Sequence, residues 1–156
     1  MKSDHDSPPP EHDLGVFIGI VRDYFTTVGG SAAELLNPTL EWITPARLDT
    51  TGYIPVAGGL NGWIGVSLPD SMLRGLLERI GEPRHDDEAC RDFAAEMTSV
   101  ITGNARAHFG PRLRLSPPVA ARHDDPPPDL PQPRMSLKLP FRWQGDHGFL
   151  LVACTS

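Results

Sequence analysis

The sequence has few cysteines, no long apolar run and no excess of basic residues. Its two cysteines, Cys90 and Cys154, are far apart and form no CxxC pattern. This spacing excludes a disulfide framework and a zinc finger, and it suits a reducing compartment. The apolar stretch 15–21 is far too short to cross a bilayer. At a net charge of −6, the chain lacks the basic field that attracts nucleic acids or anionic membranes. We therefore expect a cytoplasmic protein that binds neither nucleic acid nor membrane.

The chain is long enough for one domain with a substantial core. Of its 156 residues, 39% are hydrophobic before glycine is counted, which is ordinary for a globular protein. Its 17 prolines and 15 glycines are unevenly distributed. Residues 1–12 combine charge with the run Pro8-Pro9-Pro10, which predicts a disordered acidic and Pro-rich tail. We expect residues 13–156 to form the single domain.

Apolar periodicity predicts an α+β fold. The expected elements are helices at about 14–28, 69–80 and 89–109, and strands at about 39–48, 53–56, 63–68, 135–139 and 149–153. Asp13 is expected to cap the first helix, and Ser67 and Asp70 have capping-box spacing before the second. A helix followed by strands occurs twice. We therefore expect two weakly similar halves, with the two long helices on one face of a mostly antiparallel sheet.

The glycines between the second and third expected strands allow two interpretations. One is a phosphate-binding loop, which needs a strand before the glycines and a helix N-terminus after them. Here the strand WIGVSL follows the glycines, and Asn61-Gly62 is a strong turn signal. The pattern therefore favours a hairpin.

The helix over 89–109 carries the most informative pattern. The face predicted to pack inward comprises Phe93, Met97, Val100, Ile101, Asn104 and Ala105. A second strip, roughly opposite, comprises Asp92, Glu96, Ser99, Gly103 and Arg106. The simplest interpretation of this strip is a solvated helix face. However, a glycine in a helix interior costs about 1 kcal/mol, so Gly103 calls for a packing or functional reason.

These segments resemble the CheX/CheC/FliY family of bacterial chemotaxis phosphatases, which act on phosphorylated CheY-like response regulators. The resemblance covers most of residues 14–153 and rests on VAGGLNGWIGVSLPDSML, EMTSVITGNARAHF and LPFRWQGDHGFLLV. In this family the long helix carries a Glu-x-x-Asn motif. The resemblance implies a CheC-like fold, and it implies that Glu96 bridges to a basic residue of the regulator. The strip from Asp92 to Arg106, with Ser99 and Gly103, is then the partner-binding surface.

The sequence departs from the family where Ser99 replaces the catalytic Asn. In the family that amide orients a water for attack on the aspartyl phosphate. The partner supplies the Mg²⁺, so the resemblance implies no cofactor of this chain's own. A serine hydroxyl also donates and accepts hydrogen bonds, but it reaches less far. Thr98 is rotated about 100° from Ser99 on a helix and does not replace the amide.

Three functions therefore stay open. The first is an aspartyl-phosphate phosphatase in which Glu96 and Ser99 are the catalytic pair. The second is a silent module that binds the regulator without hydrolysis, and the third is a small-ligand sensor domain of the same fold. The expected strands after residue 111 would leave unpaired backbone groups at the edge of the sheet, and related members pair through a continuous sheet. We therefore also expect a homodimer.

Other polar and Pro-rich segments have simpler interpretations. Acid–histidine clusters at 4–6, 11–13, 85–88 and 123–125 lie mostly in expected loops or the tail, so we expect no metal site. His108 is expected to be packed or half-buried. Nine prolines fall between 111 and 140, and the segment 111–133 is expected to act as a stiff connector. Its alternative role is a polyproline ligand for an aromatic groove.

Overall fold

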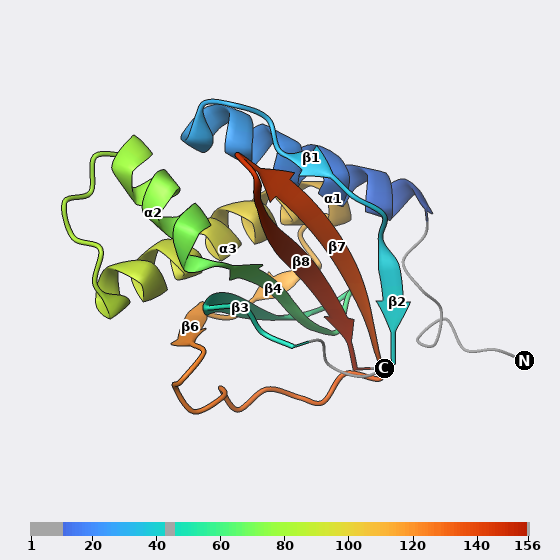
Figure 1. The fold of residues 1–156 in the computed structure, drawn as a ribbon. Helices are drawn as coiled ribbons and strands as arrows, with labels where there is room; N and C mark the ends of the chain where they lie inside the picture. The colour runs from blue at the N-terminus through green and yellow to red at the C-terminus, as the bar shows by residue number, and fades with distance from the viewer. Residues whose placement is uncertain (1–10, 43–45, 156) are drawn as a thin grey trace, which may run out of the picture.

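One antiparallel sheet carries three α-helices on one of its faces (Figure 1). The computed structural model describes residues 11–42 and 46–155. The elements in chain order are α1 (Glu11–Tyr24), the π-helix η2 (Phe25–Gly29), β1 (Glu34–Leu35), β2 (Thr39–Glu41), β3 (Thr50–Ala57), β4 (Gly62–Leu68), α2 (Asp70–Arg79), α3 (Asp87–Phe109), β5 (Arg114–Leu115), β6 (Val119–Arg122), β7 (Met135–Trp143) and β8 (Asp146–Cys154). The predicted α+β class is confirmed. Most of the predicted tail, residues 1–10, lies outside the described residues.

Two halves of the chain repeat the same order of elements. Each half has one long helix, two short edge strands and a hairpin: α1 with β1 to β4, and α3 with β5 to β8. The sheet order is β1-β7-β8-β4-β3-β5, with β2 also on β7 and β6 also on β3. If each strand is replaced by its counterpart in the other half, β1 by β5 and so on, the order of strands in the sheet is unchanged. Because each pair of edge strands joins the hairpin of the other half, the two halves interlock.

A proline stands at the same place in each half. Pro55 in β3 and Pro140 in β7 lie opposite the gap between the two short edge strands. A proline has no N–H to donate, so it fits where the neighbouring strand is interrupted. The carbonyls of both prolines still accept hydrogen bonds, from Ser116 N–H at 3.0 Å and from Leu36 N–H at 2.9 Å. β7 therefore continues past Pro140, although the pattern predicted a strand that ends at residue 139.

The sheet buries apolar side chains on both faces, but unequally. The face under the helices packs against residues such as Phe17, Leu76 and Met97, all of them fully buried. The opposite face carries a smaller cluster of Tyr53, Trp63, Phe149, Leu151 and Ala153. The loop 123–134 runs beneath this second face and adds Leu130 to the cluster (Figure 1). Fully burying one large apolar side chain stabilises a protein by about 2 kcal/mol, so the helix-covered face provides most of the core.

α3 lies directly on β3 because Gly52 has no side chain. A Cβ at Gly52 would lie 2.3 Å from Thr98 Oγ1 and 2.4 Å from the carbonyl oxygen of Ala94. This close approach sets the rotation of α3 about its own axis. The buried face comprises Ala89, Cys90, Phe93, Ala94, Met97, Thr98, Ile101, Thr102 and Ala105. The prediction that Val100 and Asn104 pack inward is wrong, since both are exposed.

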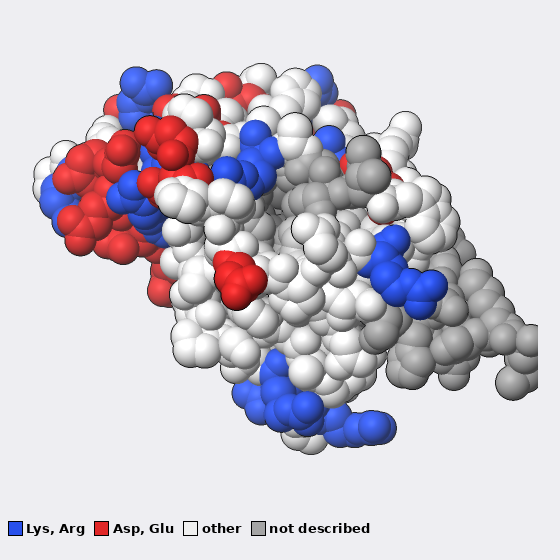
Figure 2. Space-filling model, turned by 90° about the horizontal axis from the view of Figure 1, so that it is seen from below, with Lys and Arg blue, Asp and Glu red and all other residues white. Residues whose placement is uncertain are grey.

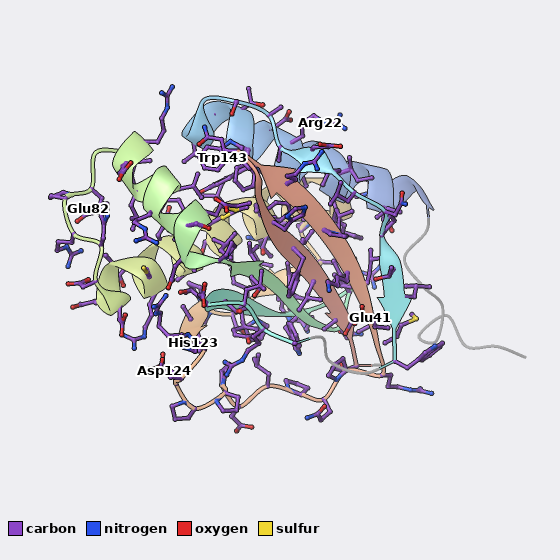
Figure 3. All side chains as sticks on the ribbon, viewed as in Figure 1. Arg22, Glu41, Glu82, His123, Asp124 and Trp143 are labelled. Atoms are coloured by element: carbon purple, nitrogen blue, oxygen red, sulfur yellow. The ribbon has the colours of Figure 1, made fainter. Side chains whose placement is uncertain are left out.

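The η2 turn and α2 both pack on Trp143, which lies at the end of β7 near these helices (Figure 3). Its indole Nε1 donates to the carbonyl and hydroxyl oxygens of Ser31, at 3.2 and 3.0 Å. A Cβ would lie 2.9 Å from the indole ring at Gly29 and 3.3 Å from it at Gly75. Two glycines therefore make room for one tryptophan. Gly30 has φ of +81°, which confirms the predicted end of the first helix.

The predicted capping box before α2 is wrong. The Ser67 hydroxyl accepts the N–H of Leu48 at 2.8 Å and bonds the Thr51 hydroxyl at 2.9 Å. The N–H of Asp70 instead donates to the carboxylate of Asp49 at 2.8 Å. A residue from a distant loop thus satisfies the first turn of α2, because the sheet holds that loop beside it.

Two further boundaries differ from the predictions. α1 begins at Glu11, so Asp13 lies inside the helix rather than at its cap. The β3–β4 turn spans 58–61, and Gly62 already belongs to β4. The side-chain amide oxygen of Asn61 accepts the N–H of Gly58 at 3.2 Å, which closes a four-residue turn.

Candidate functional site

α3 presents an exposed strip on the side away from the sheet. Asp92, Glu96, Gly103 and Arg106 are exposed, and Ser99 is partly exposed. Val100, next to them, is 39% exposed. The expected accessibility of Glu96, Ser99 and Gly103 is confirmed. The opposite face of the helix is locked onto β3, so these residues keep fixed positions relative to one another.

The Glu96 carboxylate is not committed to another side chain. Within the described part of the chain it forms no ion pair and no hydrogen bond. Tyr24, at the end of α1, lies near it and is 7% exposed. Burial raises the pKa of Tyr24, and the charge of Glu96 raises this pKa further. The phenol therefore stays protonated. The sequence gives no signal for this neighbour, because only the packing of α1 on α3 brings it close.

Ser99 and Thr98 carry adjacent hydroxyls in different environments. Thr98 is fully buried, and its hydroxyl donates to the carbonyl oxygen of Ala94 at 2.7 Å. The Ser99 hydroxyl has no hydrogen-bond partner among residues 11–42 and 46–155. Helical serines often bond the carbonyl four residues earlier, so this unbonded hydroxyl is available to a partner. Thr98 cannot take its place.

Gly103 has no packing role within the chain. A Cβ there would meet nothing within 4 Å outside the backbone of its own helix, as far as the structure describes the chain. The glycine opens a shallow hollow of about 370 Å³, which it lines with Arg106, Ala107, Gly110 and Pro111. Alanine would therefore fit at Gly103 and would favour the helix, so the described structure gives this glycine no packing reason.

The sequence model of the family described as "Chemotaxis phosphatase CheX" matches residues 50–142, which include β3, β4, α2 and all of α3. The match covers more than half of the chain. The protein belongs to the CheX family. Among curated protein sequences no match was found.

Solved structures have the same fold at low sequence identity. A CheX chemotaxis protein from Desulfovibrio desulfuricans is 17% identical with a TM-score of 0.73, covering 90% of this chain and 97% of that one. A CheC-like superfamily protein from Shewanella sp. PV-4 is 15% identical with a TM-score of 0.75, covering 92% and 97%. CheX in a CheX–CheY–BeF₃–Mg²⁺ complex from Borrelia burgdorferi is 14% identical with a TM-score of 0.68, covering 90% and 96%. At these identities the likeness shows the CheX-type fold.

Ion pairs hold the N-terminal end of α3 in this CheX-family chain. Arg122, at the end of β6, is 9% exposed, and its guanidinium contacts Asp70 and, at 3.3 Å, Asp87. The hydrogen bond from Arg122 lowers the pKa of Asp70. Arg91 donates to both oxygens of Asp125, at 2.8 and 3.0 Å. This pair, with the backbone N–H of Arg122, lowers the pKa of Asp125 to about 2. These contacts fix the helix at its flank. Within the strip, Asp92 lies 4.0 Å from the guanidinium of Arg84, and Glu96 forms no ion pair in the described chain.

Side chains of the described acid–histidine clusters cap a helix or form ion pairs between elements. Asp86 caps α3 by accepting the N–H of Ala89 at 2.8 Å, and His108 pairs with Asp13 at 2.9 Å. His123 and Asp124 lie on the loop after β6 (Figure 3). Among the described side chains, no three His, Cys, Asp or Glu residues are grouped so as to hold a metal. The cluster at 4–6 lies outside the described residues.

Acidic side chains gather at one end of the molecule, where α2 leads into α3 (Figure 2).

None of the helices that the structure describes has the length and hydropathy of a membrane span.

Proposed function

We propose that this protein binds a phosphorylated CheY-like response regulator through the α3 strip, formed by Asp92, Glu96, Ser99, Gly103 and Arg106. Gly103 carries the proposal, because it weakens an exposed helix and fills no packing role among the residues that the structure describes. A bare helix surface lets a partner approach closely. One protein of the same fold occurs in a complex with CheY, which supports this class of partner.

Glu96 supplies the charge contact. Its carboxylate is exposed and forms no ion pair within the described chain, so it can accept charge-assisted hydrogen bonds from a Lys or Arg of the regulator. The neighbouring phenol of Tyr24 is neutral and does not repel an acidic partner. Asp92 and Arg106 put opposite charges at the two ends of the strip, which favours one docking orientation.

Ser99 takes the water-positioning place. In the hydrolysis of an aspartyl phosphate, the water oxygen bonds to phosphorus as the bond to the aspartate oxygen breaks, and the carboxylate leaves. The regulator holds the phosphoryl group and Mg²⁺, so this chain contributes positioning alone. A serine hydroxyl ends about 1.3 Å, one carbon–nitrogen bond, before the amide nitrogen of an asparagine. We therefore expect regulator binding with slow hydrolysis.

The proposed slow hydrolysis is tested by measuring phosphate release from a phosphorylated CheY-like regulator with and without this protein. We expect Ser99→Asn to accelerate release at least tenfold over the wild type, a change of about 1.4 kcal/mol in activation free energy. Val100→Asn is the matched control, because it places the same amide at an exposed position about 100° around the helix. It should leave the rate unchanged.

Binding is measured separately from hydrolysis. Glu96→Ala should weaken regulator binding both in the wild type and in the Ser99→Asn background, whereas Glu78→Ala, on the exposed side of α2, should not. Intact binding with an unchanged rate in Ser99→Asn would show that Ser99 is not the limiting group. Equal binding by the wild type and Glu96→Ala would refute docking through the strip.

We also propose that the protein forms a homodimer through the β2 edge of the sheet. Leu40 and Trp42 at this edge are 46% and 73% exposed. β2 pairs with β7 on one side and, in the described residues, with no strand on the other. Light scattering at tens of micromolar should give the mass of a dimer, and Trp42→Ser should lower it. A monomer in the wild type would contradict this proposal.

A further inference from the structure

A second cavity lies on the sheet face that carries no helix, far from the α3 strip. It is a half-open cavity of about 320 Å³ between Tyr53 and Trp63 of the sheet and the prolines of the loop 123–134. An engineered cavity of about 150 Å³ holds one benzene, so this space admits a ring system with a substituent. Most of this side of the molecule carries no charge (Figure 2). The cavity is therefore a mostly apolar groove with one charged residue, Arg47, among the described residues that line it.

The walls of the cavity are held in place by contacts that do not involve a ligand. Tyr53 and Trp63 are 4% and 3% exposed, and their rings meet edge to face with centroids 5.3 Å apart. The indole Nε1 of Trp63 donates to the carbonyl oxygen of Pro131 at 3.1 Å, which ties the loop to the sheet. Prolines fix their own φ angles, so this loop loses little conformational entropy when a ligand binds. The site is preorganised.

Arg47 lines the cavity and is the one charged residue among the described residues that do so. Its Nη1 is buried and has no hydrogen-bond partner in the structure as described. The backbone next to it is anchored, because the N–H of Leu48 donates to Ser67 Oγ at 2.8 Å. A guanidinium stays charged at any physiological pH, and a buried donor without a partner is costly. A negatively charged group bound in the cavity, which Arg47 lines, would supply an acceptor for the guanidinium.

We propose that this cavity binds a small organic acid with a planar apolar body and one carboxylate. Tyr53, Trp63 and the prolines enclose the body, and the guanidinium of Arg47 pairs with the carboxylate, as its fork geometry favours. One cation among apolar walls matches one negative charge. A phosphate ester would bring a second charge that no other basic lining residue meets. This binding site is independent of regulator docking, since it lies on the other face of the sheet.

The test uses the full-length protein and two probes of equal shape, indole-3-acetate and its uncharged amide, indole-3-acetamide. Titration calorimetry gives both affinities, and NMR of the Trp63 indole N–H locates the site. We expect the acid to bind at least tenfold more tightly than the amide and to shift the Trp63 signal. Equal affinities, or no binding of either probe at millimolar concentration, would overturn the proposal.

Variants of Arg47 separate its charge from its shape. Arg47→Met should abolish the preference for the acid, whereas Arg47→Lys should retain part of it. The matched control Arg112→Met removes an exposed arginine that does not line the cavity and should leave the preference unchanged. If the preference survives in Arg47→Met, the assigned recognition is wrong. If that variant does not fold, the wild-type comparison of acid and amide still decides.

Discussion

The two sides of α3 use the same kinds of residue for opposite purposes. On the sheet side, Gly52 of β3 lets the helix backbone approach and Thr98 bonds its hydroxyl within the helix. On the outer side, Gly103 faces open space and the Ser99 hydroxyl is unbonded in the described chain. A glycine or hydroxyl is thus structural where the fold uses it, and it is a candidate for partner binding where the fold does not. One substitution, glycine to alanine, tests this difference on both sides.

The largest effect is expected for Gly52→Ala. The new methyl group would lie 2.4 Å from the backbone oxygen of Ala94, which a side-chain rotation cannot relieve. α3 must move off β3, so we expect a loss of about 3 kcal/mol in the free energy of unfolding. Urea denaturation followed by circular dichroism measures it. A variant as stable as the wild type would show that the helix does not lie as close to β3 as described.

A smaller effect of opposite sign is expected for Gly103→Ala. Alanine favours the helix and meets no neighbour outside the α3 backbone in the described structure, so the free energy of unfolding should rise by up to about 1 kcal/mol. The same variant should bind the regulator more weakly if the bare surface is a docking contact. Greater stability with unchanged binding would leave Gly103 without a role in docking.

The smallest effect concerns the flank of α3, where Arg91 pairs with Asp125. The pKa of Asp125 is lowered from an ordinary 3.8 to about 2 in the folded state, first by Arg91 and then by the N–H of Arg122. A lowered folded-state pKa stabilises the protein above pH 3.8, and this contribution is lost as the pH falls through about 2. Arg91→Gln should therefore reduce the loss of stability between pH 4 and pH 2.

Thermal unfolding at several acidic pH values measures this slope. Arg22→Gln is the control, because Arg22 is exposed on α1 (Figure 3) and its side chain makes no contact given for the described residues. An equal slope in the wild type and Arg91→Gln would mean that the pair does not persist in solution.

Local patterns predicted much of the fold. Stripes with helical spacing located the three helices, and Gly30 and Gly81 end two of them with positive φ, as a glycine at a helix end favours. Strand lengths were predicted less well. A proline usually marks the end of a strand, yet Pro140 lies inside β7, because β1 and β2 leave a gap opposite it. That gap depends on residues distant in sequence.

The candidate site divides in the same way. The spacing of Glu96, Ser99 and Gly103 was enough to put them on one helix face, because that face follows from 100° per residue alone. The spacing did not predict which other residues of α3 are buried. Val100 and Asn104 were expected to pack inward, but both are exposed. Helical periodicity defines faces only relative to one another, whereas the contact of α3 with Gly52 fixes the absolute rotation.

The sequence by itself determined the three helices, the two central hairpins and the polar strip of α3, because these depend on residues close to each other in the chain. It did not predict the short edge strands β1, β5 and β6. Only the tertiary structure decided which hydroxyl of the adjacent pair at 98 and 99 is buried, that Asp49 satisfies the first turn of α2, and that Tyr24 lies near Glu96. The same holds for the cavity beside Arg47, whose walls come from three separate segments. These features arise where segments far apart in the chain meet, and their geometry is set by the packing of helix on sheet, which no local pattern encodes.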